Sequence, residues 1–298
     1  MHDLLGKVID TKVIDQNDNY YVVQANGYSF LFDKSEADHQ LGIGAHIRGF
    51  AYQNNNGKFQ VTTNIPNVLR GSYAWGTVVG NAHNVGIFIN IGIKNKDFVL
   101  SIDELPNEKR LWPQKNDQLL VSLCIDKTNR LWCHLANEDI FRSISRKASS
   151  DMHNQNISAT VYKTKLYGSL VLTNQYYLGF IHASERNKEP RLGEQVNGRV
   201  IGVRDDGTLN LSLRKRGYES INDDAIQIMM ALDHADEYTL NFSDKSDPSL
   251  IKAYFGISKG QFKRAIGRLL KLRYIVQENG HIRLTGQGQQ AANERKIQ

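Results

Sequence analysis

Residues 84–92 read NVGIFINIG and follow a strand start, GTV, at residues 76–78. Apolar residues alternate on both sides of a central glycine, which is typical of a β-hairpin. The same phrase returns at residues 161–171, and the segments LGEQVNGRV (192–200) and DDGTLNLSL (205–213) close that later copy with a second glycine turn. A repeated small β unit predicts an array of similar modules in place of one large catalytic core.

The composition is that of an ordinary folded protein. The chain has 298 residues, of which 40% are hydrophobic, enough for about two or three domains with a core in each. Lysine and arginine total 37 against 31 acidic residues, and the net charge of +6 favours an anionic partner. The start lacks the apolar run of a signal peptide, and no segment has the roughly 20 apolar residues of a membrane span. We therefore expect a cytoplasmic protein without a membrane partner.

Residues 1–66 are predicted to form a first barrel of five short strands. Apolar and aromatic residues alternate at 20–23, 28–32 and 45–51, and an Asn-Gly turn at residues 56–57 leads into the last strand. A small closed barrel satisfies the faces and edges of so short a sheet. Some aromatic residues of this unit must fill the core, so none is assigned to a site individually: Tyr20, Tyr21, Tyr28, Phe30 and Phe32.

Two further barrels are predicted at residues 75–136 and 157–216. The polar stretch between them, 143–156, is rich in serine and is interpreted as a linker with a short amphipathic turn around Phe141. After Tyr218 the apolar period changes from two to about 3.6, which indicates a switch from strands to helices.

Residues 219–288 are predicted to form a winged helix-turn-helix domain. Asp247 before Pro248 is typical of a helix start, and the four residues from Ser258 fit a capping box that opens a longer helix. An Asn-Gly pair at Asn279 supplies the turn of a hairpin. The fold class is therefore mainly β with a small α+β end: tandem five-stranded OB-fold barrels followed by a winged helix.

These modules resemble those of a known family. Residues 76–136 and 157–216 look like S1 domains, the five-stranded oligonucleotide-binding barrel of RNA-binding proteins, and residues 1–66 look like a diverged third copy. Three such barrels before a winged helix resemble the bacterial conserved virulence factor B family. The resemblance implies a regulatory protein that binds single-stranded RNA, acts in post-transcriptional control of gene expression and requires no catalytic activity.

The resemblance also implies site residues in the second barrel. S1 domains bind RNA with aromatic residues of the second strand, a histidine at the end of the third, and polar or basic residues near the last hairpin, so that bases stack on rings and cations meet phosphates. Phe88 matches the second aromatic position, and Asp126 and Arg130 match the hairpin pair. Val85 and Ser101 depart from the family pattern. Barrel packing of Phe88 remains an alternative interpretation.

The third barrel matches the family pattern at other positions. Tyr167 matches the first aromatic residue, whereas Leu170 replaces the second. His182 matches the histidine, and Arg204 and Thr208 occupy the positions of the hairpin pair. A hydrogen-bonded structural role of His182 stays open. Because each barrel has only part of the face, we expect weak binding by one barrel and avidity across the linked barrels.

The longer helix of the winged-helix domain carries the strongest basic cluster of the chain. No acidic residue interrupts this cluster, although a merely soluble face usually mixes charges of both signs. Phosphate contact and a solvated helix face are the two interpretations. The cluster comprises Lys259, Lys263, Arg264, Arg268, Lys271 and Arg273.

No enzyme, cofactor or metal site is predicted. The segment 42–44 lacks the third glycine of a dinucleotide loop, and the nine histidines show no metal-ligand spacing. Cys124 and Cys133 are too few for a disulfide scaffold, so we expect reduced cysteines with a structural role.

Two other functions are compatible with the sequence. One is a DNA-binding transcription regulator whose winged helix enters the major groove. Its helix offers few base-reading side chains beyond Gln261, so phosphate contact is better supported than base readout. The other is a scaffold on a ribosome or an RNA-degrading complex, in which the barrels bind protein.

Overall fold

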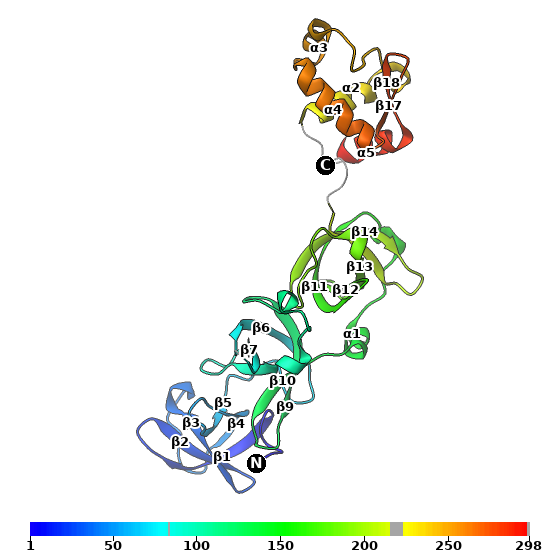
Figure 1. The fold of residues 1–298 in the computed structure, drawn as a ribbon. Coiled ribbons are helices and arrows are strands. Elements are labelled where there is room, and N and C mark those ends of the chain that lie inside the picture. The colour runs from blue at the N-terminus through cyan, green and yellow to red at the C-terminus, as the bar shows by residue number, and fades with distance from the viewer. Residues whose placement is uncertain (83, 215–222, 297–298) are drawn as a thin grey trace. The chain divides into compact units, whose positions relative to one another are not determined.

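The structure is a computed structural model and describes residues 1–82, 84–214 and 223–296. The chain divides into two compact units, Met1–Leu213 and Arg214–Gln298. The first unit contains three closed five-stranded barrels, and the second is a winged-helix domain (Figure 1). The predicted fold class is confirmed. The predicted end of the third barrel at residue 216 and the predicted start of the last domain at residue 219 lie outside the described residues.

The first barrel uses most of its aromatic residues as core. Strand alternation buries Phe30 and Phe32 on one face of β3, and Tyr21 is also buried, whereas Tyr28, at the hairpin end of that strand, is 45% exposed. The strands pair in the order β1-β2-β3-β5-β4, with β3 and β5 parallel. Their bounds are β1 (Val8–Gln16), β2 (Tyr20–Ala25), β3 (Tyr28–Asp33), β4 (His46–Gln53) and β5 (Phe59–Thr62).

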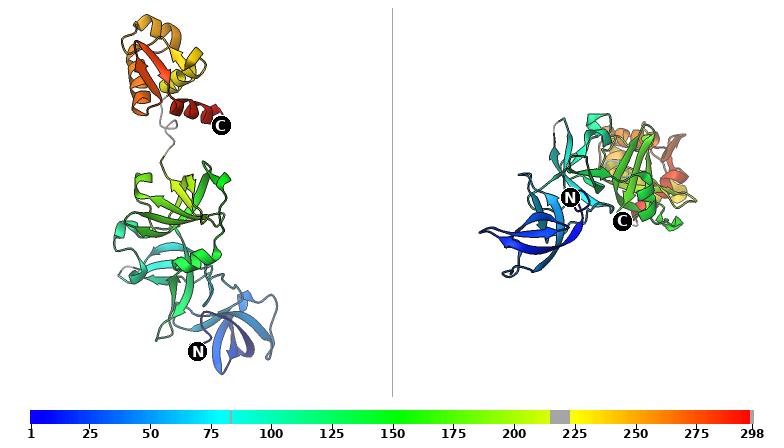
Figure 2. Two further views of the ribbon diagram at one scale, coloured as in Figure 1. Left: turned by 90° about the vertical axis from the view of Figure 1, so that its right-hand side faces the viewer. Right: turned by 90° about the horizontal axis from the view of Figure 1, so that it is seen from below.

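The second and third barrels repeat this strand order, and Figure 2 shows the strands from two further directions. In all three barrels the first strand bulges where it pairs with the second, at Val13/Asp15, Val78/Gly80 and Val161/Lys163. A shared bulge, which bends and twists the strand, marks the barrels as repeats of one plan. The strands are β6 (Ala74–Asn81), β7 (Gly86–Asn90), β8 (Phe98–Ser101), β9 (Gln118–Ile125), β10 (Leu131–Leu135), β11 (Asn156–Lys165), β12 (Gly168–Thr173), β13 (Leu178–His182), β14 (Gln195–Val203) and β15 (Leu209–Ser212).

Buried contacts join the first barrel to the second. Phe50 and Tyr52 of β4 stack with 6.0 Å between ring centroids and belong to the hydrophobic cluster of the second barrel. Burial raises the pKa of Tyr52 to about 12. The guanidinium of Arg70 donates to the carbonyl oxygens of His2 and Leu5 at 2.6 and 3.1 Å. Apolar and polar contacts thus act together at this junction.

A buried ion pair joins the second barrel to the third. Arg191 donates through Nε and Nη2 to the two carboxylate oxygens of Asp117, at 3.2 and 3.1 Å, and Asp117 is only 8% exposed. The amide of Gln118 donates to the carbonyl of Gly193 at 3.0 Å, and Leu192 lies in the cluster of the second barrel. A bidentate pair constrains direction as well as distance, so this contact links the two barrels more specifically than a single hydrogen bond would.

The stretch 143–156, which was interpreted as a linker, starts within the last turn of a short helix that packs on the third barrel. This helix, α1 (Glu138–Ile144), starts at Asn137, whose side chain accepts a hydrogen bond from the amide of Ile140. Phe141 is buried and stacks on Tyr162 of β11 with 3.9 Å between ring centroids. The expected amphipathic turn is therefore a helix, because its apolar side has a partner that sequence spacing does not show.

The second unit has the element order of a winged helix. The predicted N-cap at Asp247 and capping box at Ser258 are confirmed, and both residues of the turn Asn279–Gly280 have positive φ, 50° and 84°. The sequence pattern does not predict β16, which has two residues, or α5, which buries the small pair Ala291–Ala292. The elements are α2 (Asp223–Asp233), β16 (Thr239–Leu240), α3 (Pro248–Phe255), α4 (Lys259–Lys271), β17 (Ile275–Glu278), β18 (His281–Leu284) and α5 (Gly286–Lys296).

Candidate nucleic-acid interface

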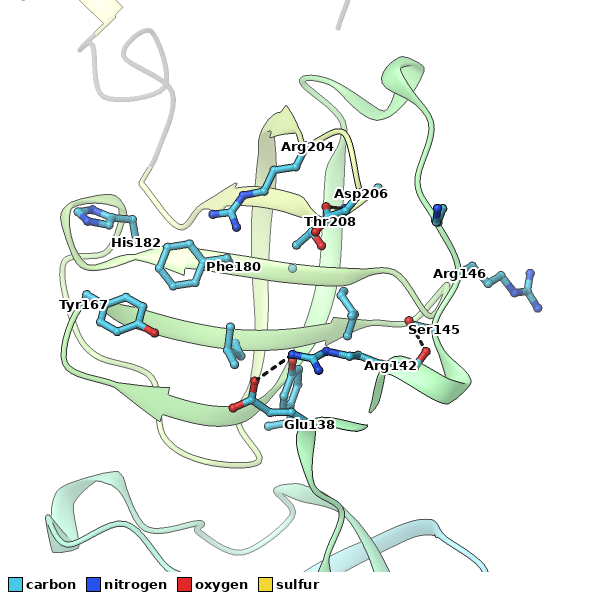
Figure 3. A pocket seen from close by; sticks show the side chains of 16 residues that line it. Glu138, Arg142, Ser145, Arg146, Tyr167, Phe180, His182, Arg204, Asp206 and Thr208 are labelled. Carbon is cyan, nitrogen blue, oxygen red and sulfur yellow. Dashed lines mark hydrogen bonds and ion pairs between the residues drawn. The ribbon is translucent and has the colours of Figure 1, made fainter. Parts of the chain in front are cut away.

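The third barrel presents a row of rings at its surface (Figure 3). Tyr167, just before β12, is 57% exposed, and its ring centroid lies 5.9 Å from that of Phe180 on β13. The ring of His182 lies 6.2 Å from Phe180, and the two share a strand face because they are two residues apart. The structure thus brings the predicted residues Tyr167 and His182 together through Phe180. Alternation along β13 was the sequence signal for Phe180, which our sequence analysis missed.

Arg204 lies over this row of rings. Its guanidinium carbon is 5.4 Å from the centre of the Phe180 ring, and its Nε donates to Oδ1 of Asn210 at 3.1 Å. Asn210 is the register partner of Phe180 on the neighbouring parallel strand, β15. Because this anchor uses only Nε, the two Nη groups of Arg204 can donate to a phosphate. The row therefore offers a ring and a cation at one place.

His182 also has a structural role. Its Nδ1 accepts a hydrogen bond from the amide of Ser184 at 3.2 Å and caps the 3-10 turn Ala183–Glu185. Ser101 and Asp33 cap the equivalent turns of the second and first barrels. Since Nδ1 is the acceptor, the neutral ring carries its proton on Nε2, which can donate to a ligand. Capping and ligand contact are therefore compatible at this position.

Thr208, the partner of Arg204 in the family pattern, shapes the hairpin turn. Its amide donates to Oδ1 of Asp206 at 2.8 Å. This bond is the main reason that the pKa of the Asp206 carboxyl is lowered. Thr208 therefore holds the turn that carries Arg204.

The second barrel has a related cross-strand row, but its rings lie on the two outer strands of the row, β7 and β10, and not on the middle strand, β8. Phe88 of β7 is 37% exposed and pairs with Val99 of β8, which pairs with Trp132 of β10. Residues in one cross-strand row share a face, so Phe88 and Trp132 flank Val99 on the outside of the barrel. Trp132 was not singled out from the sequence, because its register with β8 is a long-range contact.

Asp126 and Arg130, predicted as a pair, have different surroundings. The carboxylate of Asp126 accepts hydrogen bonds from the amides of Arg130 and Thr128, at 2.9 and 2.8 Å, and from Nε1 of Trp132 at 3.2 Å. The bond from the Arg130 amide is the largest cause that lowers the pKa of Asp126 to about 2. Asp126 thus holds the turn and Trp132, whereas the Arg130 side chain is exposed.

The first barrel lacks such rings on the equivalent face. The same register row consists of Val22, Leu31 and Gln60. The aromatic side chains of this barrel are mostly in its core. The aromatic surface is therefore strongest in the third barrel.

A cleft of about 720 Å³ opens beside the rings of the third barrel. Figure 3 shows Arg204 on one side of Phe180, and Arg142 and Glu138 of α1 on the other. Leu170, which replaces the second aromatic residue of the family pattern, also lines the cleft. Ligand pockets commonly measure about 300–1,000 Å³, so the volume suits a ligand of nucleotide size.

The winged-helix domain exposes cations on α4. Lys263, Arg264 and Arg268 are exposed, opposite the buried face of the helix. Lys259 is half-buried, and its Nζ donates to the carbonyl of Lys245 at 3.4 Å. Lys271 and Arg273 are exposed as well, so the structure separates Lys259 from the other five cations of the predicted cluster.

Three observations bear on other kinds of site. Among residues 1–82, 84–214 and 223–296, no three His, Cys, Asp or Glu side chains cluster closely enough to hold a metal ion. No helix in the described part of the chain has both the length and the apolar character to cross a membrane. Cys124 and Cys133 are free, and burial raises the pKa of the Cys133 thiol, which disfavours the reactive thiolate.

Four family models match consecutive parts of the chain. An S1 domain model matches residues 5–64, and the model of the CvfB first S1-like domain matches residues 73–134. The model of the second domain of virulence regulatory factor CvfB matches residues 141–215, and the CvfB-like winged helix domain matches residues 227–284.

Full-length relatives agree with these matches. Conserved virulence factor B of Staphylococcus epidermidis is 37% identical over 290 residues, which are 96% of each chain. A Bacillus subtilis protein named uncharacterized protein YitL is 34% identical over 277 residues, 92% of each chain. A crystal structure of a multidomain protein with nucleic acid binding domains from Streptococcus pneumoniae is 41% identical, covers 95% of this chain and 99% of its own, and superposes with a TM-score of 0.68.

Proposed function

The chain belongs to the conserved virulence factor B family, and from that premise we propose that it binds single-stranded RNA and acts in post-transcriptional control of gene expression. Its S1-like and winged-helix domains are of nucleic-acid-binding types. We place this activity in the cytoplasm and assign no catalytic step to it. The functional modules of the proposal are residues 1–66, 75–136, 157–216 and 219–288.

One observation carries the proposal: Arg204 lies over Phe180, with Tyr167 and His182 beside the ring. A base can stack on an exposed ring only where the face of the base is not already covered by neighbouring bases, and a single strand meets this condition. A guanidinium group at the ring can then meet the phosphate of the same nucleotide. The proposed RNA contacts are Tyr167, Phe180, His182 and Arg204 in the third barrel and Phe88, Arg130 and Trp132 in the second, with Asp126 as a positioning residue.

Binding measurements on the full chain test the proposal. Single-stranded RNA, single-stranded DNA and duplex DNA of equal length are compared in filter-binding assays at several salt concentrations. We expect the tightest binding to single-stranded RNA, with affinity falling as salt rises because phosphate contacts release counterions. Equal or tighter binding to the duplex would overturn the preference for single strands.

The exposed cations of α4 favour a second candidate, a DNA-binding regulator. In a winged helix, the second helix of the helix-turn-helix enters the major groove. Lys263, Arg264 and Arg268 suit phosphates, which position a protein on DNA without reading its sequence. Sequence-dependent affinity for a duplex, lost when these cations are removed, would favour this candidate over the RNA proposal.

A further inference from the structure

The segment that follows α1 is built into the third barrel. The amide of Arg146 donates to the carbonyl of Tyr176 at 2.7 Å, and the amide of Ala148 donates to the carbonyl of Gly207 at 3.1 Å. Gly207 has a φ of +82°, and a Cβ atom there would lie only 2.7 Å from Cβ of Lys147. A glycine at this turn therefore lets the segment pass close to the hairpin that carries Arg204.

Helix α1 itself is anchored to β11 of the same barrel. Oε1 of Glu138 forms ion pairs with Nζ of Lys163 at 2.7 Å and with Nζ of Lys165 at 3.1 Å. The Lys163 contact is the main cause that lowers the pKa of the Glu138 carboxyl. Together with the stack of Phe141 on Tyr162, these contacts fix the helix beside the cleft. The wall that α1 contributes is thus part of the barrel's own structure.

The cleft carries more available positive than negative charge. The charge of Glu138 is balanced by Lys163 and Lys165, whereas Asp206 stays an anion, so the surplus comes from four basic side chains in the lining against two acidic ones. A cleft with a surplus of cations raises the local concentration of an anionic ligand. The basic residues that line it are Arg142, Arg146, Lys147 and Arg204, and the acidic ones are Glu138 and Asp206.

We propose that α1 is the second wall of the RNA site on the third barrel, an inference that rests on the proposed function. A base stacks on Phe180, and the guanidinium groups of Arg204 and Arg142, which lie on opposite sides of this ring, contact successive phosphates (Figure 3). Arg142 now pairs with Asp139 at 3.2 Å and with Glu138 at 3.9 Å. Surface ion pairs of this kind are weak, so a phosphate can replace them.

A binding role of α1 compensates for the aromatic residue that the third barrel lacks. Leu170 stands where the family pattern has its second ring, and Glu138 and Arg142 of α1 line the same cleft. The family model of the second domain begins at residue 141, within α1, and therefore takes in most of the helix together with the barrel. The site extends beyond the five strands, and Arg142 is a binding residue that lies outside the S1 barrel.

The test uses the full chain and an unstructured RNA of about 12 nucleotides, within the usual range of one OB-fold site. For Arg142→Ala we expect binding weakened by about 5- to 20-fold at low salt and a salt slope reduced by about 0.7, the value for one phosphate contact on a single strand. Lys188→Ala is the matched control, because Lys188 is exposed, belongs to the same barrel and does not line the cleft. We expect little change in the control.

Asp139→Asn provides an independent variant. The Asp139 carboxylate competes with RNA for Arg142, so we expect its removal to tighten binding by about 2- to 5-fold. Equal affinities of Arg142→Ala and Lys188→Ala, in folded proteins that still lose affinity on Phe180→Ala, would overturn the role of α1 and leave the proposed function intact. A wild-type chain without preference for single-stranded RNA would instead overturn the proposed function itself.

Discussion

Arg204 is held over Phe180 with 5.4 Å between the guanidinium carbon and the ring centre. Asn210 fixes this position, because its Oδ1 accepts the Nε hydrogen of Arg204 at 3.1 Å. Asn210 on β15 is also the register partner of Phe180 on β13. The sheet therefore places the anchor of the cation beside the ring. Groups that are positioned before the ligand arrives lose less freedom on binding, and this favours affinity.

The first prediction concerns stacking in the third barrel. Phe180→Ala and Tyr167→Ala should each cost about 1–3 kcal/mol of RNA affinity with little change in salt slope, since stacking releases few counterions. The measurement is RNA affinity against salt for the full chain. Tyr28→Ala is the control, because Tyr28 is an exposed tyrosine of the first barrel outside both rows of rings.

The outcome separates ligand contact from core packing. Unchanged affinity in folded Phe180→Ala and Tyr167→Ala would remove the stacking role and favour a protein-binding scaffold. Loss of the folded state, seen in circular dichroism melts, would assign the ring of Phe180 to the barrel core.

The second prediction concerns the row of rings in the second barrel. Phe88→Ala and Trp132→Ala should each weaken binding by about 1–3 kcal/mol if bases stack there. Each single variant should lose the gain from linked modules and bind about as weakly as one isolated site, and the double variant of Phe88 and Phe180 should bind more weakly still, because both sites then lack a ring. Titration of an RNA long enough to span both barrels measures this. A double variant no weaker than Phe180→Ala would show that the second barrel does not take part.

The fold was largely predictable because its signals are local. Alternation with glycine turns marks the strands, and the caps at Asp247 and Ser258 mark helices that the structure confirms. The faces of the strands follow from the same alternation, which is why Tyr167 and His182 lie near each other as family positions suggest. Their role in RNA binding stays a prediction.

The missed residues depend on long-range register. Alternation along β13 places Phe180 on the face of His182, but its pairing with Asn210, like that of Trp132 with Val99, runs across parallel strands and is not visible in any local pattern. The segment around Phe141 was interpreted as a short amphipathic turn beside a linker, because its partner Tyr162 lies on a strand distant in the sequence. Long-range contacts of this kind require the assembled barrel.

The third prediction concerns the junction of the second and third barrels. Arg191→Ala leaves the carboxylate of Asp117 buried without its cation, and we expect a loss of about 2–4 kcal/mol of stability, near the range for broken buried pairs. Urea denaturation followed by tryptophan fluorescence measures the transition. Arg48→Ala removes an exposed arginine of the first barrel, away from this junction, and serves as the control. Equal midpoints of the two variants would contradict a stabilising role of the buried pair.

The fourth prediction concerns pH. The pKa of Asp126 is about 2 in the folded chain, below its ordinary value of 3.8, so its contribution to stability is present above about pH 4 and is lost as pH falls toward 2. The indole NMR signal of Trp132, whose Nε1 donates to this carboxylate, should shift over the same range. Asp126→Asn should remove that titration. A Trp132 signal that titrates equally in the variant would assign the effect to another group.

The last prediction tests the cations of α4. Lys263 and Arg264 are exposed on the helix face opposite its buried residues, so their replacement by alanine should leave the melt unchanged. If both contact phosphates, the salt slope for single-stranded RNA should fall by about 0.7 per contact, or about 1.4 for the double variant. The control is a double alanine variant of Lys7 and Lys188, which lowers the net charge equally at exposed positions of the barrels. A slope equal to that of the control would mean that α4 presents a solvated face. A larger loss of affinity for duplex DNA than for RNA would mean that the winged helix binds DNA, because only a DNA duplex offers the major groove that such a helix enters.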